Sequence, residues 1–83
     1  MNKALFESKW QQIRGQSTLW WSLMSDYDLK KVDKAVVKLE KYVTLLGVKY
    51  GYTREKANKE IDRHLVEYET EQRIVSSLRN SKD

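Results

Sequence analysis

The sequence predicts an all-α protein, a three-helix and mainly antiparallel up-down-up bundle with a long second helix at its centre. Apolar residues recur at steps of three and four along most of the chain, which keeps them on one stripe of a helix with about 3.6 residues per turn. The chain contains no proline and only three glycines. Two short turns, near Ser25 and Gly51, separate the periodic stretches, and short connections favour antiparallel neighbours.

The first predicted helix covers residues 3–23. Gly15 lies off its apolar stripe, where a glycine costs roughly 0.5–1 kcal/mol relative to alanine. Trp20 and Trp21 point about 100° apart on a helix, so we expect one in the core and the other at its edge. The stripe consists of Phe6, Trp10, Ile13, Ser17, Trp20 and Met24.

The second predicted helix covers residues 26–50 and has signals at both ends. Ser25 is a good N-cap, and Asp28 three residues later gives a pattern close to a capping box. Gly51 favours the left-handed conformation that ends helices. Ala35, Tyr42 and Leu45 widen the apolar stripe, so this helix is expected to contact more than one neighbour. The stripe consists of Leu29, Val32, Val36, Leu39, Val43, Leu46 and Tyr50.

The third predicted helix begins after Thr53, which is a suitable N-cap, and carries a less apolar stripe. That stripe consists of Ala57, Ile61, Leu65, Tyr68, Gln72, Val75 and Leu78. We expect residues 1–79 to form a single helical domain and residues 80–83 a disordered tail. The predicted core combines the three stripes: Phe6, Trp10, Ile13, Trp20 or Trp21, Leu29, Val32, Val36, Leu39, Val43, Leu46, Tyr50, Ala57, Ile61, Leu65 and Tyr68.

Length, composition and the apolar runs indicate the number of domains and the cellular compartment to expect. With 83 residues the chain is one domain of modest expected stability, and it has no cysteine, which excludes disulfides and cysteine zinc sites. The N-terminal stretch lacks the apolar run of a signal peptide. The apolar runs are far shorter than the ~20 residues that cross a bilayer. We therefore expect a cytoplasmic protein with no membrane partner.

The residues offer little for catalysis or for metal binding. His64 is the single histidine, so a two-histidine metal site within one chain is excluded. Glu60 and Glu67 or Tyr68 share its helix face, but a histidine at the edge of the core with a carboxylate neighbour is the favoured interpretation. Glu67 and Glu71 form a carboxylate pair one turn apart, which is typical of a solvated face. We expect no catalytic residues, no cofactor and no metal, and hence no enzyme.

A row of lysines on the second predicted helix is the best candidate for contact with a polyanion. The net charge of +4 and the pI near 9.4 agree with such a contact, although the excess charge is spread thinly. The alternative is an ordinary solvated helix face. Lys9 or Arg14 would extend the patch. The row consists of Lys30, Lys31, Lys34, Lys38 and Lys41.

Self-association is a separate expectation. The unbroken steps of three and four on the second predicted helix suit a coiled-coil seam between two chains as well as a core within one chain. The width of the apolar surface leaves a strip that a homodimer would cover. We therefore keep open a homodimer through this face.

Four short blocks of the sequence form a recognisable pattern: Trp10–Gly15, Trp21–Leu29, Tyr50–Ala57 and Ile61–Asp62, of which Tyr-Gly-Tyr-Thr at residues 50–53 is the most specific. These blocks resemble the CsbD-like family of small bacterial stress-response proteins. The chain departs from the family pattern at Ser22, where glycine is usual, in its longer second helix without the usual interior glycines, and in its continuation past Asp62.

The resemblance implies a helical, non-enzymatic and stress-induced cytoplasmic protein that acts through its surface, with an undefined molecular activity. The alternative function is a small nucleic-acid-binding or regulatory protein that uses the lysine face. Nucleic acid is the less supported of the two directions, because no motif beyond the lysine row points to it.

Overall fold

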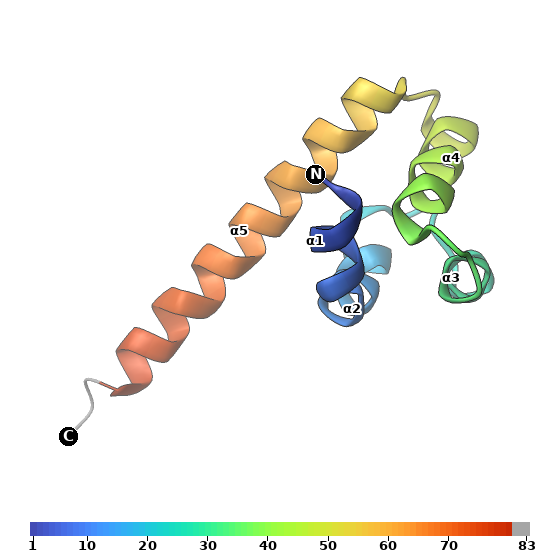
Figure 1. Cartoon of the computed structure of the whole chain (residues 1–83). Helices are drawn as coiled ribbons and strands as arrows, with labels where there is room; N and C mark the ends of the chain where they lie inside the picture. The colour runs from blue at the N-terminus through green and yellow to red at the C-terminus, as the bar shows by residue number, and fades with distance from the viewer. Residues whose placement is uncertain (81–83) are drawn as a thin grey trace.

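The computed structural model describes residues 1–80, with side chains for residues 1–76, and all regular secondary structure in this part is α-helix (Figure 1). The all-α prediction is confirmed. The three-helix bundle is wrong, because the first two predicted helices are each divided. The described residues form α1 (Lys3–Ser8), α2 (Trp10–Trp20), α3 (Asp26–Asp33), α4 (Lys38–Tyr50) and α5 (Arg54–Asn80).

The first predicted helix divides at Lys9 and ends at Trp20, three residues earlier than expected. Trp21 takes an extended conformation, with φ −132° and ψ 108°. This change of direction turns the Trp21 side chain into the core, where it is 3% exposed, and leaves Trp20 half-buried against it. The two indoles contact each other edge to face, with centroids 5.8 Å apart. Of the two adjacent tryptophans, Trp21 is thus the one that lies in the core.

The second predicted helix is broken between Asp33 and Lys38. Val37 is extended, with φ −118° and ψ 100°, and Val36 is 96% exposed. The prediction that Val36 belongs to the core is therefore wrong. Adjacent valines are weaker helix formers than the residues around them. The steps of three and four continue across the break, so periodicity alone does not reveal it.

Most of the expected helix ends are confirmed. The Ser25 hydroxyl accepts a hydrogen bond from the Asp28 amide, and the Asp28 carboxylate accepts one from the Ser25 amide, which completes a capping box. Gly51 has φ 71° and ends α4 in the left-handed conformation. The Thr53 hydroxyl accepts from the Lys56 amide at 3.1 Å and so caps α5.

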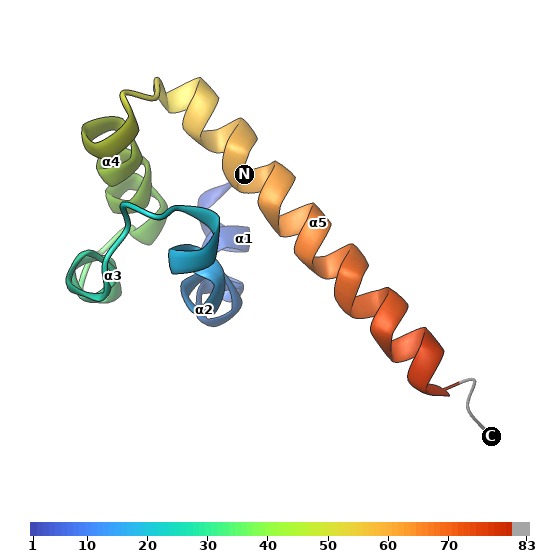
Figure 2. The same cartoon turned by 180° about the vertical axis from the view of Figure 1, so that it is seen from behind.

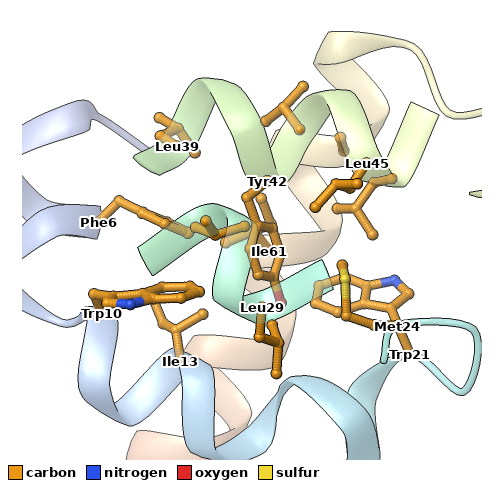
Figure 3. Packing of buried hydrophobic residues seen from close by; sticks show 14 of the residues in the cluster. Phe6, Trp10, Ile13, Trp21, Met24, Leu29, Leu39, Tyr42, Leu45 and Ile61 are labelled. Atoms are coloured by element: carbon orange, nitrogen blue, oxygen red, sulfur yellow. The ribbon is translucent and has the colours of Figure 1, made fainter. Parts of the chain in front are cut away.

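The core lies around α4, which contacts α1, α3 and α5. Tyr42 is fully buried at its middle, and Phe6, Trp10 and Trp21 pack around its ring (Figure 3). Tyr50 and Tyr68, both expected in the core, are half-buried at its edge. The buried apolar residues are Phe6, Trp10, Ile13, Trp21, Met24, Leu29, Val32, Leu39, Tyr42, Val43, Leu45, Leu46, Ala57, Ile61 and Leu65.

The helix α5 runs past the other four and projects away from them (Figures 1 and 2). The molecule measures 48 × 23 × 23 Å and has a radius of gyration of 14.1 Å, against about 12 Å for a compact domain of this length. The side chain of Leu78 and residues 81–83 of the expected tail lie outside the described residues, while Asn80 is the last residue of α5.

Candidate functional site

The five lysines of the candidate polyanion contact do not form one row, because the break after Asp33 distributes them over two helices. Lys30 and Lys31 lie in the last turn of α3, and Lys34 is its C-cap. Lys38 and Lys41 belong to the first turns of α4. Cations at the end of α3 are also favoured by the helix dipole, which gives them a structural role in addition to any contact with a partner.

Two of these lysines already have carboxylate partners. Lys30 lies 3.5 Å from Asp26 on an exposed face, and Lys38 lies 3.1 Å from Glu7 with its side chain 18% exposed. No carboxylate lies within ion-pair distance of the remaining three in residues 1–76. The lysines available to an outside anion are Lys31, Lys34 and Lys41.

The protein's own carboxylates are almost all engaged. Within residues 1–76, every aspartate and glutamate except Glu71 lies within 4.0 Å of a cation. The acids nearest in sequence to the lysines are among them, since Arg14 holds Asp33 at 2.9 Å and Arg54 holds Glu40 at 2.7 Å. The hydrogen bond from Arg14 also lowers the pKa of Asp33. The positive charge of the three available lysines is therefore not locally compensated.

Two exposed residues, Tyr27 and Val36, are close in sequence to the available lysines. The sequence predicts a surface role for neither of them. Tyr27 is 69% exposed, and the Lys31 ammonium lies 4.5 Å from its ring centroid. Residues 27, 31 and 34 are spaced so that they share one face of α3. Val36 follows in the connection to α4. We call this set the α3–α4 corner: Tyr27, Lys31, Lys34, Val36 and Lys41.

His64 is held between aromatic rings rather than in a polar cluster. Its ring stacks on Trp20 with centroids 5.2 Å apart and meets Trp21 edge to face at 4.9 Å. Burial, together with the charge of Arg63, lowers the pKa of His64, so the ring is neutral at pH 7. Glu60 is bound to Arg63 instead of facing the imidazole as a metal ligand. Residues 1–76 bring no three metal-ligating side chains together.

Two further polar groups in the interior connect the helices. The Lys49 ammonium lies 2.9 Å from the Asp28 carboxylate and joins α4 to α3. Burial acts to raise the pKa of Asp28, but hydrogen bonds from Lys49 and Ser25 outweigh it and lower the pKa to about 2. The hydroxyls of Tyr42 and Ser17 share a hydrogen bond of 2.6 Å, and burial raises the pKa of Tyr42.

Most of the apolar face that is expected to support a homodimer is buried in the core of the single chain. Leu39, Val43 and Leu46 are buried in the core. Val48 on α4 is 77% exposed and stands apart from that buried stripe. Self-association through this face stays a prediction.

Comparison with known proteins adds no identification. No family model, no curated protein and no solved structure matches the chain. The resemblance to the CsbD-like family stays a prediction from the sequence. Among the helices of residues 1–80, none has both the length and the hydropathy required to cross a membrane.

Proposed function

We propose that this protein is non-catalytic and acts by binding through its surface, as a cytoplasmic component of a stress response. The observation that carries this proposal is that the side chains best suited to acid–base chemistry are engaged in contacts within the fold. Asp28 is bound to Lys49, Tyr42 is bound to Ser17, and His64 is packed between two indoles. Each of these groups holds helices together and is engaged by a neighbour.

The blocks that resemble the CsbD-like family support the same direction, because their residues have structural roles. Trp10 and Trp21 are buried against Tyr42, Ser25 and Asp28 form the capping box, and Gly51 ends α4. Because these residues stabilise the fold, we expect the function to depend on other residues, at the surface. The stress association itself comes from the resemblance.

Survival of cells that lack the protein tests the proposal. Cells carrying a gene deletion would be exposed to heat, high salt and acid, and the gene would be restored as variants that keep the fold but lose chemical groups: Ser17→Ala, Tyr42→Phe and His64→Gln. We expect all three to restore survival in proportion to their folded amount, measured by melting of the purified proteins. A variant that melts normally and yet fails to restore survival would overturn the non-catalytic assignment.

A variant with altered surface charge, tested in the same survival experiment, shows whether the surface is required. Among residues 1–76, neither an ion pair nor a side-chain hydrogen bond depends on Lys31, Lys34 or Lys41, so the fold is expected to persist when all three are replaced by serine. If the protein acts through its surface, substitutions of this kind are the ones that reduce survival.

A further inference from the structure

We infer that the α3–α4 corner is a docking surface for an anionic lipid membrane, which it contacts peripherally without crossing. This inference rests on the proposed function, because it names the surface and the partner of a protein that acts by binding. The expectation that no membrane is a partner relies on the lack of a crossing segment. A peripheral contact needs no such segment.

The charge of the corner is the first argument. Lys31, Lys34 and Lys41 have no carboxylate partner in the described residues, and the acids Asp26, Asp33 and Glu40 beside them in the sequence are each bound to another cation. A lysine near an anionic leaflet contributes a factor of about five in affinity, so three contribute about a hundredfold. This surface suits a partner with closely spaced negative charges.

The second argument is that the corner also contains apolar side chains, which favour a lipid surface over nucleic acid as the partner. Val36 is 96% exposed in the connection between two helices, with Lys34 two residues before it. Duplex nucleic acid offers phosphates and largely polar groove edges, whose apolar groups are the thymine methyls of the major groove, so an isopropyl group gains little apolar contact there. The boundary between lipid headgroups and acyl chains accepts both the aliphatic side chain and the lysines around it.

Tyr27 extends the same argument. Its ring is 69% exposed and carries the Lys31 ammonium 4.5 Å from its centroid. Aromatic rings with a polar end concentrate at the membrane–water interface, since one part of the side chain is apolar and the other is hydrated. The corner therefore combines a cationic group, an aliphatic group and an amphipathic ring.

The shape of the corner is the third argument. The five lysines expected on one helix would follow a phosphate backbone in a straight line, but the break at residues 34–37 places them on two helices. In Figures 1 and 2, α3 and the start of α4 lie on the side of the molecule away from the projecting end of α5. The projecting end of α5 therefore does not cover α3 or the start of α4, and these two helices are open to a partner on that side.

Co-sedimentation of the full chain with vesicles tests the inference. One set of vesicles contains phosphatidylcholine with roughly 30% phosphatidylserine, and the other contains phosphatidylcholine alone. We expect binding only to the anionic set and a steep loss of binding between about 50 and about 300 mM NaCl. Replacing Lys31, Lys34 and Lys41 by serine is expected to weaken binding about a hundredfold. Val36→Ser is expected to weaken it severalfold, because it removes apolar area without changing charge.

A matched variant separates this site from net charge. Lys3, Lys56 and Arg73 are the other described cations without a carboxylate partner, and replacing them by serine removes the same three charges away from the corner. The inference predicts that this control binds at least tenfold better than the corner variant. Equal loss in both variants, or an unchanged affinity for Val36→Ser, would overturn it.

Fluorescence anisotropy with a short labelled DNA duplex and a single strand gives the competing outcome. Tight nucleic-acid binding through the same lysines that is indifferent to Val36→Ser, with no vesicle binding, would overturn the lipid assignment in favour of nucleic acid. Absence of binding to vesicles and to nucleic acid would also overturn it. Neither result decides the proposed function, which is tested by survival with the chemical-group variants.

Discussion

The two parts of α5 have similar apolar patterns and different surroundings. In the first part, Ala57 and Ile61 are fully buried and Leu65 is 4% exposed, because the other helices lie against them. In the last part, Ile74 is 55% and Val75 is 43% exposed. The last described ion pair between α5 and the rest of the chain joins Glu69 to Lys9. A stripe of apolar residues therefore predicts a helix face, but burial depends on what lies opposite.

The same substitution in both parts of α5 gives the largest expected contrast. Ile61→Asp places a carboxylate in a fully buried apolar site, and we expect loss of cooperative folding. Ile74→Asp places it in solvent, and we expect a change in unfolding free energy within about 0.5 kcal/mol. Thermal melts followed by circular dichroism would measure both. A normal melt for Ile61→Asp would contradict the packing of α5.

Disrupting the ion pair between α3 and α4 is expected to have the next largest effect. The pKa of Asp28 is lowered to about 2 in the folded chain, below its unfolded value of about 3.9, so the carboxylate contributes stability above about pH 4. This contribution, about 2 kcal/mol, is lost as the pH falls from about 4 to about 2. Asp28→Asn should remove it at pH 7, as urea unfolding would show.

Asp26→Asn is the matched control for that experiment, since Asp26 lies in the same turn but is 65% exposed in its side chain. We expect it to cost less than about 1 kcal/mol. Equal effects of the two substitutions would mean that the buried ion pair does not stabilise the contact between α3 and α4.

Two glycines should respond to alanine with opposite signs. Gly51 has φ 71°, where a β-carbon costs about 1 kcal/mol or more, so Gly51→Ala should lower the melting temperature by roughly 4–8 °C. Gly15 lies in α2, and a β-carbon added there would meet no atom within 4 Å, so Gly15→Ala should raise the melting temperature slightly. A destabilising Gly15→Ala would contradict the open surroundings of that position.

Acidification should weaken the packed part of α5 through His64. The pKa of His64 is lowered in the folded chain, so the neutral ring favours folding at pH 7. That contribution is lost as the pH falls from about 6.5 through the lowered folded value. A small decrease in the urea midpoint between pH 7.5 and pH 5 would show it, and His64→Gln should abolish the decrease. A decrease that persists in His64→Gln would assign it to another group.

Removing residues 72–83 is expected to have the smallest effect. These residues include the exposed Ile74 and Val75, and the segment removed lies beyond the last described ion pair between α5 and the rest of the chain. We expect the melting temperature to change by no more than a few degrees. A large decrease would show that the projecting part has a stabilising contact.

Part of the candidate site followed from the sequence and part did not. Number and spacing identify the lysines as a candidate contact but do not reveal their division over two helices, because Val32, Val36 and Leu39 keep helical spacing across the break. The same spacing wrongly predicts that Val36 belongs to the core. Most of the ion pairs that engage the nearby carboxylates, such as Glu7 with Lys38 and Glu40 with Arg54, join residues from different helices, and no local pattern reveals them. Asp26 with Lys30 is a local i,i+4 pair.

The sequence by itself determined the helical class, the capping box at Ser25, the left-handed end at Gly51 and most of the apolar stripes, because each depends on neighbours within a few residues. Only the tertiary structure decided that Trp21 rather than Trp20 enters the core, that the chain breaks after Asp33, and that α5 runs beyond the other helices. These features depend on which surfaces meet after folding. Contacts between distant residues offset the modest cost of ending a helix early.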